Sequence, residues 1–234
     1  MSLRPRSAGP VNGQGDDIVV PSPYTLFALL LQYPDPEILD ARAEIAEAIR
    51  TLPEPRHGEP GLNRFLAWWL ETPGWELQAT YVDIFDLGRR CSLHLTYPLF
   101  GDRRERGMAL LRVKHRYVLH GLELNDRELP DFLPVMLEYA AGEPDGEALL
   151  AEHRVSLELL RAALDDLGSA YADPVASVCA LLGPLSDAER DQAREIAEHG
   201  PPMETVGLEP FAPPEVMPAA PADAIGTTEQ GRRR

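Results

Sequence analysis

The segment that decides the fold is residues 81–138, which read YVDIFDLGRR CSLHLTYPLF GDRRERGMAL LRVKHRYVLH GLELNDRELP DFLPVMLE. Apolar residues recur in it every three or four positions, a spacing that predicts helices. Asp102 followed by Glu105 predicts a capped helix start, and Gly121 is placed to end that helix. Residues 92–98 alternate polar and apolar side chains, but no other stretch offers a partner strand. An extended connector between helices is therefore predicted there.

The helix that begins at Asp102 is predicted to bury one face. Its buried side is expected to carry the residues that recur at helical spacing, Met108, Leu111, His115 and Val118. In the helix that follows, Pro134 lies inside the apolar run and removes one backbone donor, so a bend is expected there.

Helices are also predicted on both sides of this segment, from apolar periodicity and from caps such as Asp35 and the capping box of Ser186 with Glu189. Upstream they cover about residues 22–33, 35–52, 62–70 and 72–88, and downstream about residues 128–140, 145–167, 173–182 and 186–200. Their spacing of four residues predicts that Tyr81 and Phe85 share one helix face. Because no paired strand signals are present, the predicted fold class is all-α, a single-domain helical bundle.

The ends of the chain differ in composition from its middle. With 234 residues and 44% apolar content, the chain can bury one substantial core. Residues 1–20 lack apolar periodicity and are expected to form a disordered arm, and residues 201–234, rich in Pro and Ala, a flexible tail. The expected domain is residues 21–200.

Charge is distributed unevenly along the chain. The formal net charge is −16, which argues against nucleic-acid binding. Residues 87–120 hold eight basic against two acidic residues, a local +6 that leaves −22 for the remainder. This asymmetry has two interpretations, a solvated helix face paired with acidic neighbours or a dipolar surface that orients a partner. Because the helix dipole disfavours cations at a helix start, at least one of Arg103, Arg104 and Arg106 is expected to pair with an acidic group such as Asp83, Asp86 or Asp131.

The sequence offers little for catalysis or metal binding. Cys91 and Cys179 occur in unrelated contexts, so both are expected to stay reduced and no metal is expected. His94 lies three residues after Cys91 but lacks a second ligand pair, and a structural histidine is expected. Ser92, His94 and Asp102 lack the glycine-flanked turn of a hydrolase nucleophile. Neither a secretory signal nor a membrane-spanning apolar run is visible, which predicts a soluble, cytoplasmic protein without direct membrane insertion.

Four blocks of the central segment resemble the NarJ family of nitrate reductase assembly chaperones. In order, these blocks are residues 81–86 (YVDIFD), 92–95 (SLHL), 101–107 (GDRRERG) and 128–138 (ELPDFLPVMLE). The resemblance implies an all-helical, non-enzymatic chaperone of the larger group that includes the TorD and DmsD proteins. One departure is that Thr96, Tyr97 and Pro98 stand where the family usually has a residue followed by Glu-His, so no role of that pair is transferred.

The resemblance also implies a partner. This partner is the apo catalytic (alpha) subunit of respiratory nitrate reductase, which is bound through its N-terminal segment while its molybdenum cofactor is inserted. Proteins of molybdenum cofactor biosynthesis are implied as further partners. The chaperone itself needs no cofactor. The residues expected to form the partner-binding surface are Tyr81, Asp83, Phe85, Asp86, Ser92, Leu93, His94, Leu95, Asp102, Arg103, Arg106, Asp131 and Leu133.

In this interpretation, the apolar members line a groove and Asp83, Asp86 and Asp131 form an acidic rim. The alternative for Phe85 and Leu133 is a place in the core. Two alternative functions remain open, a chaperone of another molybdoenzyme and an enzyme that binds a small anionic ligand at residues 103–106.

Overall fold

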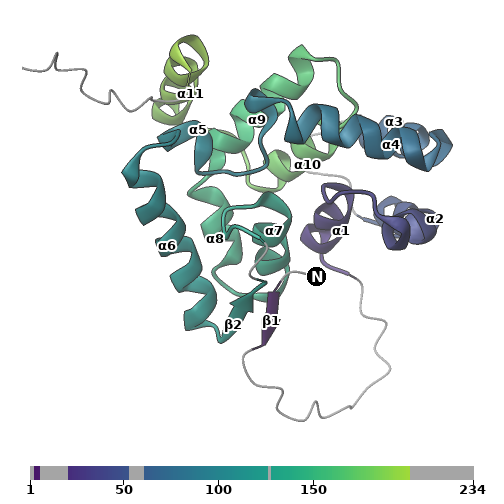
Figure 1. Ribbon diagram of the computed structural model, residues 1–234, viewed down its shortest axis with the longest axis horizontal. Helices are drawn as coiled ribbons and strands as arrows, with labels where there is room; N and C mark the ends of the chain where they lie inside the picture. Colours follow the sequence, from purple (N-terminus) through teal and green to yellow (C-terminus); the bar gives the residue numbers. More distant parts are fainter. Residues whose placement is uncertain (1–2, 6–20, 53–60, 126–127, 201–234) are drawn as a thin grey trace, which may run out of the picture. The chain divides into compact units, whose positions relative to one another are not determined.

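The computed structural model describes residues 3–5, 21–52, 61–125 and 128–200, and helices dominate this part of the chain (Figure 1). The helices are α1 (Pro23–Leu30), α2 (Pro36–Arg50), α3 (Gly61–Glu71), α4 (Gly74–Tyr81), the π-helical turn η1 (Val82–Asp86), the 3₁₀ turn η2 (Arg89–Cys91), α5 (Tyr97–Phe100), α6 (Arg104–Leu119), α7 (Leu133–Gly142), α8 (Gly146–Ala151), α9 (Arg154–Asp166), α10 (Ala172–Leu181) and α11 (Asp187–His199). The all-α prediction is confirmed.

One small sheet adds to the helical fold. Strands β1 (Leu3–Pro5) and β2 (Leu122–Leu124) pair antiparallel, with Leu3 opposite Leu124 (Figure 1). The expectation of a disordered arm is therefore wrong for residues 3–5, where Leu3 is buried against the core. Residues 1–2 and 6–20, and the tail expected over residues 201–234, lie outside the described residues.

The core is built around α7, which packs against α1 on one side and α8 on the other. Leu133, Met136 and Tyr139 of α7 are fully buried. An aromatic cluster extends this core, with the Tyr171 ring centroid 5.0 Å from Phe85 and 5.5 Å from Phe65. Such tilted and edge-on pairs add to the stabilisation that burial provides.

Helix α6 is rotated relative to the prediction. It begins at Arg104, not Asp102, and no side chain caps its start. Its buried residues are Ala109, Val113 and Tyr117, whereas Met108, Leu111, His115 and Val118 are exposed. Tyr117 sets the rotation, because its hydroxyl donates to the Pro130 carbonyl over 2.7 Å and its ring lies 4.8 Å from that of Tyr139.

Two further predictions are wrong because the observed helices begin and end at other residues than expected. Helix α7 begins at Leu133, so Pro134 occupies the first turn, where a missing N–H breaks no helical bond and causes no bend. The single helix expected over residues 145–167 is interrupted at Glu152 and His153, which separate α8 from α9. The His153 ring nitrogen Nδ1 lies 2.9 Å from the Leu149 carbonyl oxygen at this break.

The end of α4 widens into the π-helical turn η1, where the Leu87 amide donates to the Val82 carbonyl five residues earlier. Gly88 follows directly, and a Cβ at this position would lie 2.3 Å from the Ile84 carbonyl oxygen. Only glycine fits so close to the preceding turn. This geometry keeps Tyr81 and Phe85 on one face, with ring centroids 4.7 Å apart, as their spacing predicts.

The predicted capping box of the last helix is confirmed and gives a first stability prediction. The Ser186 hydroxyl accepts from the Glu189 amide over 3.3 Å, and the Glu189 carboxylate accepts from the Ser186 amide over 2.7 Å. Ser186→Ala should lower the free energy of unfolding by about 1 kcal/mol. Chemical denaturation measures this loss, and the same stability for the variant and the parent would contradict it. Ser186→Asn, which retains a capping oxygen, is the matched control.

Candidate functional site

The connector at residues 92–96 pairs with residues 131–133, which lie about 40 positions later in the sequence. The Leu95 amide donates to the Asp131 carbonyl over 3.0 Å, and the Leu133 amide donates to the Leu93 carbonyl over 2.8 Å. His94 and Phe132 form the β-bridge between these two bonds. The extended connector predicted over residues 92–98 is thus confirmed only around the His94 bridge, where it does have a partner segment. The chain turns at Thr96, and Tyr97 and Pro98 already belong to α5.

The side chain of Asp131 locks this pairing. It is fully buried and lies 3.1 Å from the His94 ring nitrogen Nδ1, while the Thr96 amide donates to its other oxygen over 3.1 Å. The Thr96 hydroxyl also donates to it, and an Arg106 terminal nitrogen lies 3.8 Å away. Burial alone would raise the pKa of Asp131, but the hydrogen bonds from His94 and Thr96 outweigh it and hold this pKa below its ordinary value.

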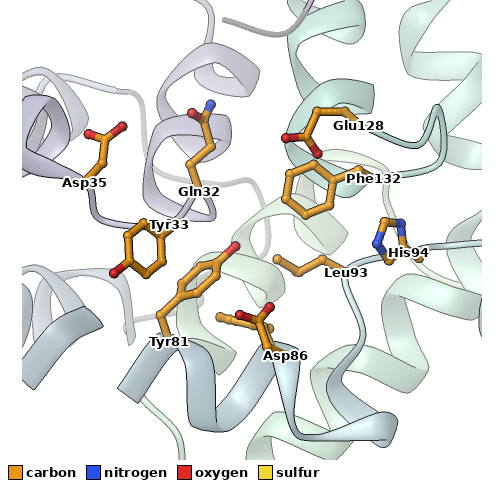
Figure 2. Close-up of a pocket in the computed structure, with 10 residues that line it drawn as sticks. Gln32, Tyr33, Asp35, Tyr81, Asp86, Leu93, His94, Glu128 and Phe132 are labelled. Carbon is orange, nitrogen blue, oxygen red and sulfur yellow. The ribbon is translucent and has the colours of Figure 1, made fainter. Parts of the chain in front are cut away.

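This pairing supplies one wall of a hollow of about 430 Å³, which we call the aromatic cleft (Figure 2). Its remaining walls come from the turn between α1 and α2, from the end of α4 with η1, and from residues 128–132. The residues that line it are Gln32, Tyr33, Asp35, Tyr81, Phe85, Asp86, Leu93, His94, Glu128 and Phe132.

Two hydrogen bonds hold the turn between α1 and α2 in place at the cleft. The Tyr81 hydroxyl donates to the Leu31 carbonyl over 3.1 Å, and the Gln78 side-chain amide donates to the Pro34 carbonyl over 2.9 Å. Burial raises the pKa of Tyr81, so its hydroxyl stays protonated and able to donate. The Tyr33 and Tyr81 rings meet edge to face at 5.6 Å.

The cleft is apolar at its floor and acidic at its edge. Tyr81, Phe85 and Leu93 are almost completely buried beneath it, whereas three carboxylates, those of Asp35, Asp86 and Glu128, line it (Figure 2). No Lys or Arg is among its lining residues, and no basic residue in the described part of the chain pairs with Asp86 or Glu128. Uncompensated carboxylates beside an apolar floor favour a ligand that is both apolar and basic.

The sequence-predicted site residues are distributed over four environments. Tyr81, Phe85, Asp86, Leu93 and His94 line the aromatic cleft. Ser92 and Arg106 line a second hollow of about 320 Å³, which shares Phe85, Asp86 and His94 with the first. Outside both hollows lie the exposed residues Asp83, Asp102 and Arg103, and in the core lie Leu95, Asp131 and Leu133.

Asp131 is thus not part of an acidic rim. Its role is internal, and its contact with Arg106 confirms that at least one arginine of residues 103–106 pairs within the fold. The Arg106 guanidinium also donates to the Thr96 hydroxyl over 3.2 Å and lies 5.4 Å from the Tyr97 ring centroid.

The sequence analysis missed five residues of the cleft. These are Gln32, Tyr33, Asp35, Glu128 and Phe132. Asp35 was identified as a helix cap, and its side chain does accept from the Ile38 amide over 2.9 Å. Asp35 also lines the cleft, because of how α1 and α2 pack, and no local sequence signal predicts this.

The arrangement of these groups does not resemble a hydrolytic triad. The carboxylate next to His94 belongs to Asp131, whereas Asp102 is exposed at the start of α6. Ser92 Oγ accepts from the His94 backbone amide over 3.2 Å, and no hydrogen bond among the described residues joins it to the imidazole.

Cys91 and Cys179 are free thiols, and burial raises the pKa of both, to about 12 for Cys179. No three His, Cys, Asp or Glu side chains in the described ranges are grouped as metal ligands. Over the same ranges, no helix is long and apolar enough to cross a membrane.

Comparison with known proteins identifies the class of protein that carries this helical fold and cleft. Residues 52–177 match the sequence model of the family described as "Nitrate reductase delta subunit". This match covers more than half of the chain, from α3 to α10. The chain therefore belongs to the nitrate reductase delta subunit family.

Individual relatives show which proteins the chain is similar to. The nitrate reductase molybdenum cofactor assembly chaperone NarJ of Escherichia coli K12 is 39% identical over 146 residues, which are 61% of this chain and 62% of that protein. The probable NarJ of Bacillus subtilis is 35% identical over 122 residues, 50% of this chain and 64% of that one. The nitrate reductase-like protein NarX of Mycobacterium tuberculosis H37Rv is 44% identical over 101 residues, 42% of this chain and 16% of NarX. The chain thus spans about three fifths of the length of the E. coli relative, and the NarJ resemblance is confirmed.

Proposed function

We propose that this protein is a dedicated chaperone for the assembly of respiratory nitrate reductase. It binds the apo catalytic subunit in the cytoplasm through that subunit's N-terminal segment, and it holds the subunit while the molybdenum cofactor is inserted. Proteins of molybdenum cofactor biosynthesis are further partners in this scheme. The protein acts by binding and catalyses no reaction.

The observation that carries this proposal is the aromatic cleft with its three carboxylates. A cleft with an apolar floor and an acidic edge suits an amphipathic segment whose apolar side chains enter the hollow and whose basic side chains face the carboxylates. The names of the relatives, all concerned with nitrate reductase, support the choice of client. The tight internal use of Arg106 argues against the alternative of an anion-binding enzyme at residues 103–106.

The test of the site is a double substitution at the cleft edge, Asp86→Asn with Glu128→Gln. It keeps side-chain size and removes two charges, so binding of a synthetic N-terminal peptide of the catalytic subunit should weaken about tenfold at low salt, or about 1.4 kcal/mol. The difference should shrink at about 0.5 M salt, where screening is strong. Isothermal titration calorimetry measures both values.

The matched control is Asp83→Asn with Asp102→Asn, which removes two exposed charges outside both hollows. It should bind the peptide like the parent. Equal losses in the two double variants would mean that net charge, not the cleft, attracts the peptide. Co-purification tests the function separately from the site. The proposal fails if the parent protein retains no apo nitrate reductase subunit. If another molybdoenzyme subunit is retained instead, its identity shows which client the protein serves.

A further inference from the structure

One exposed face of α6 carries three large apolar side chains, and the sequence pattern predicts burial for two of them, Met108 and Leu111. Met108, Leu111 and Leu119 are 57%, 60% and 70% exposed. They recur with Arg104 and His115 at intervals of three or four residues, so they share one face of the helix. Three large apolar side chains left in water along one helix are a feature of binding surfaces.

This face borders a hollow of about 800 Å³, which we call the α6 groove. Leu99 and Phe100 of α5 line one part of it, and Leu149 of α8, with Glu152 and His153, lines another. The groove is therefore a hollow between helices whose volume can accommodate side chains of a partner. It shares no lining residue with the aromatic cleft.

The charges around the groove are basic. Arg112 lines it and Arg104 is exposed on the same helix, and neither forms an ion pair with a described residue. The acid of the groove, Glu152, is already paired with Arg116, which also lies 3.4 Å from Asp145. Cations without partners beside exposed leucines favour an acidic, amphipathic ligand.

We propose that the α6 groove is a second protein-binding surface, whose occupant is an acidic amphipathic helix of another protein. A symmetric pair of these chains is disfavoured, because it would place Arg104 and Arg112 against their own copies. An anionic membrane is disfavoured because the surface is concave and the whole chain carries −16. The proposal is independent of the aromatic cleft, and the two surfaces have opposite charge preferences.

The probe for this groove is an 18-residue alanine-based peptide with leucine at positions i, i+3, i+4 and i+7 and four glutamates on the opposite helix face, labelled with fluorescein. Its counterpart has the same leucines with lysine in place of glutamate. By fluorescence anisotropy, the full-length chain should bind the acidic peptide at least tenfold more tightly than the basic one. A preference for the basic peptide, equal binding of the two, or binding of neither overturns the proposal.

Leu111→Gln should weaken binding of the acidic peptide at least tenfold. The matched control is Leu167→Gln, which changes a leucine of the same exposure, 63% against 60%, outside the groove, and should leave binding unchanged. Equal losses in the two variants overturn the proposal. Circular dichroism should show the same helix content in both variants, because each replaced side chain is exposed.

The other two occupants are tested with the same proteins. Concentration-dependent dimerisation that Leu111→Gln abolishes, measured by sedimentation, would assign the groove to a second copy of the chain. Binding to phosphatidylglycerol vesicles that Leu111→Gln abolishes, without binding of the acidic peptide, would assign it to a membrane surface. Either result overturns the proposal.

Discussion

Replacing Asp131 by Asn should lower the free energy of unfolding at pH 7 by about 3 kcal/mol, because it removes the buried charge that His94, Thr96 and Arg106 surround. The side-chain NH₂ group of Asn replaces one carboxylate oxygen and cannot accept the hydrogen bonds that Thr96 donates. Two hydrogen-bond donors would then face each other in the core. Urea denaturation measures the loss. Asp102→Asn, at an exposed position, should leave the stability nearly unchanged.

The pH dependence of this loss has a definite sign. The pKa of Asp131 is lowered on folding, so the stability it contributes is complete above the unfolded pKa of 3.8 and disappears as the pH falls through the folded pKa. The difference between the parent and Asp131→Asn should therefore shrink as the pH falls below 3.8. A difference that grows below pH 3.8 would contradict the assignment of Asp131 as a buried carboxylate.

Gly146→Ala should be comparably harmful, for steric reasons. Gly146 begins α8 beneath α7, where a Cβ would lie 2.3 Å from the Ala140 Cα and 2.8 Å from the Tyr139 carbonyl oxygen. These are backbone atoms that cannot rotate away, so α7 and α8 must separate, at a cost of about 3 kcal/mol or more. The melting temperature should fall by several degrees or more.

Gly142→Ala is the matched control for this prediction. Gly142 is the last residue of α7, and a Cβ there would meet no atom within 4 Å. Alanine restricts the unfolded chain and favours the helix, so the variant should gain up to about 1 kcal/mol. If both alanine variants lost stability equally, the close packing of α7 on α8 would not be the cause.

The sequence predicts helices well where local signals act alone. The cap at Asp35, the capping box at Ser186 and the spacing of Tyr81 and Phe85 need only neighbouring residues, and the structure confirms all three. The rotation of α6 is different, because the Tyr117 hydroxyl bond to Pro130 decides it and cannot be read from α6 itself.

The candidate site was predictable in part for the same reason. Residues 81–94 are close in sequence, and five of them meet in the cleft as expected. Asp131 looked like a surface acid because its three side-chain contacts come from residues 25 to 37 positions away along the chain. A buried carboxylate is indistinguishable from an exposed one until the groups that pair with it are placed.

The aromatic cleft is assembled from residues 32–35, 81–94 and 128–132, and this has a thermodynamic consequence. An unfolded chain has no such surface, so a ligand of the cleft binds only the folded state and must stabilise it. At a free ligand concentration of about 100 times the dissociation constant, the gain is about 2.7 kcal/mol. In the proposed role, each bound client segment would therefore hold one copy of this protein in its folded state.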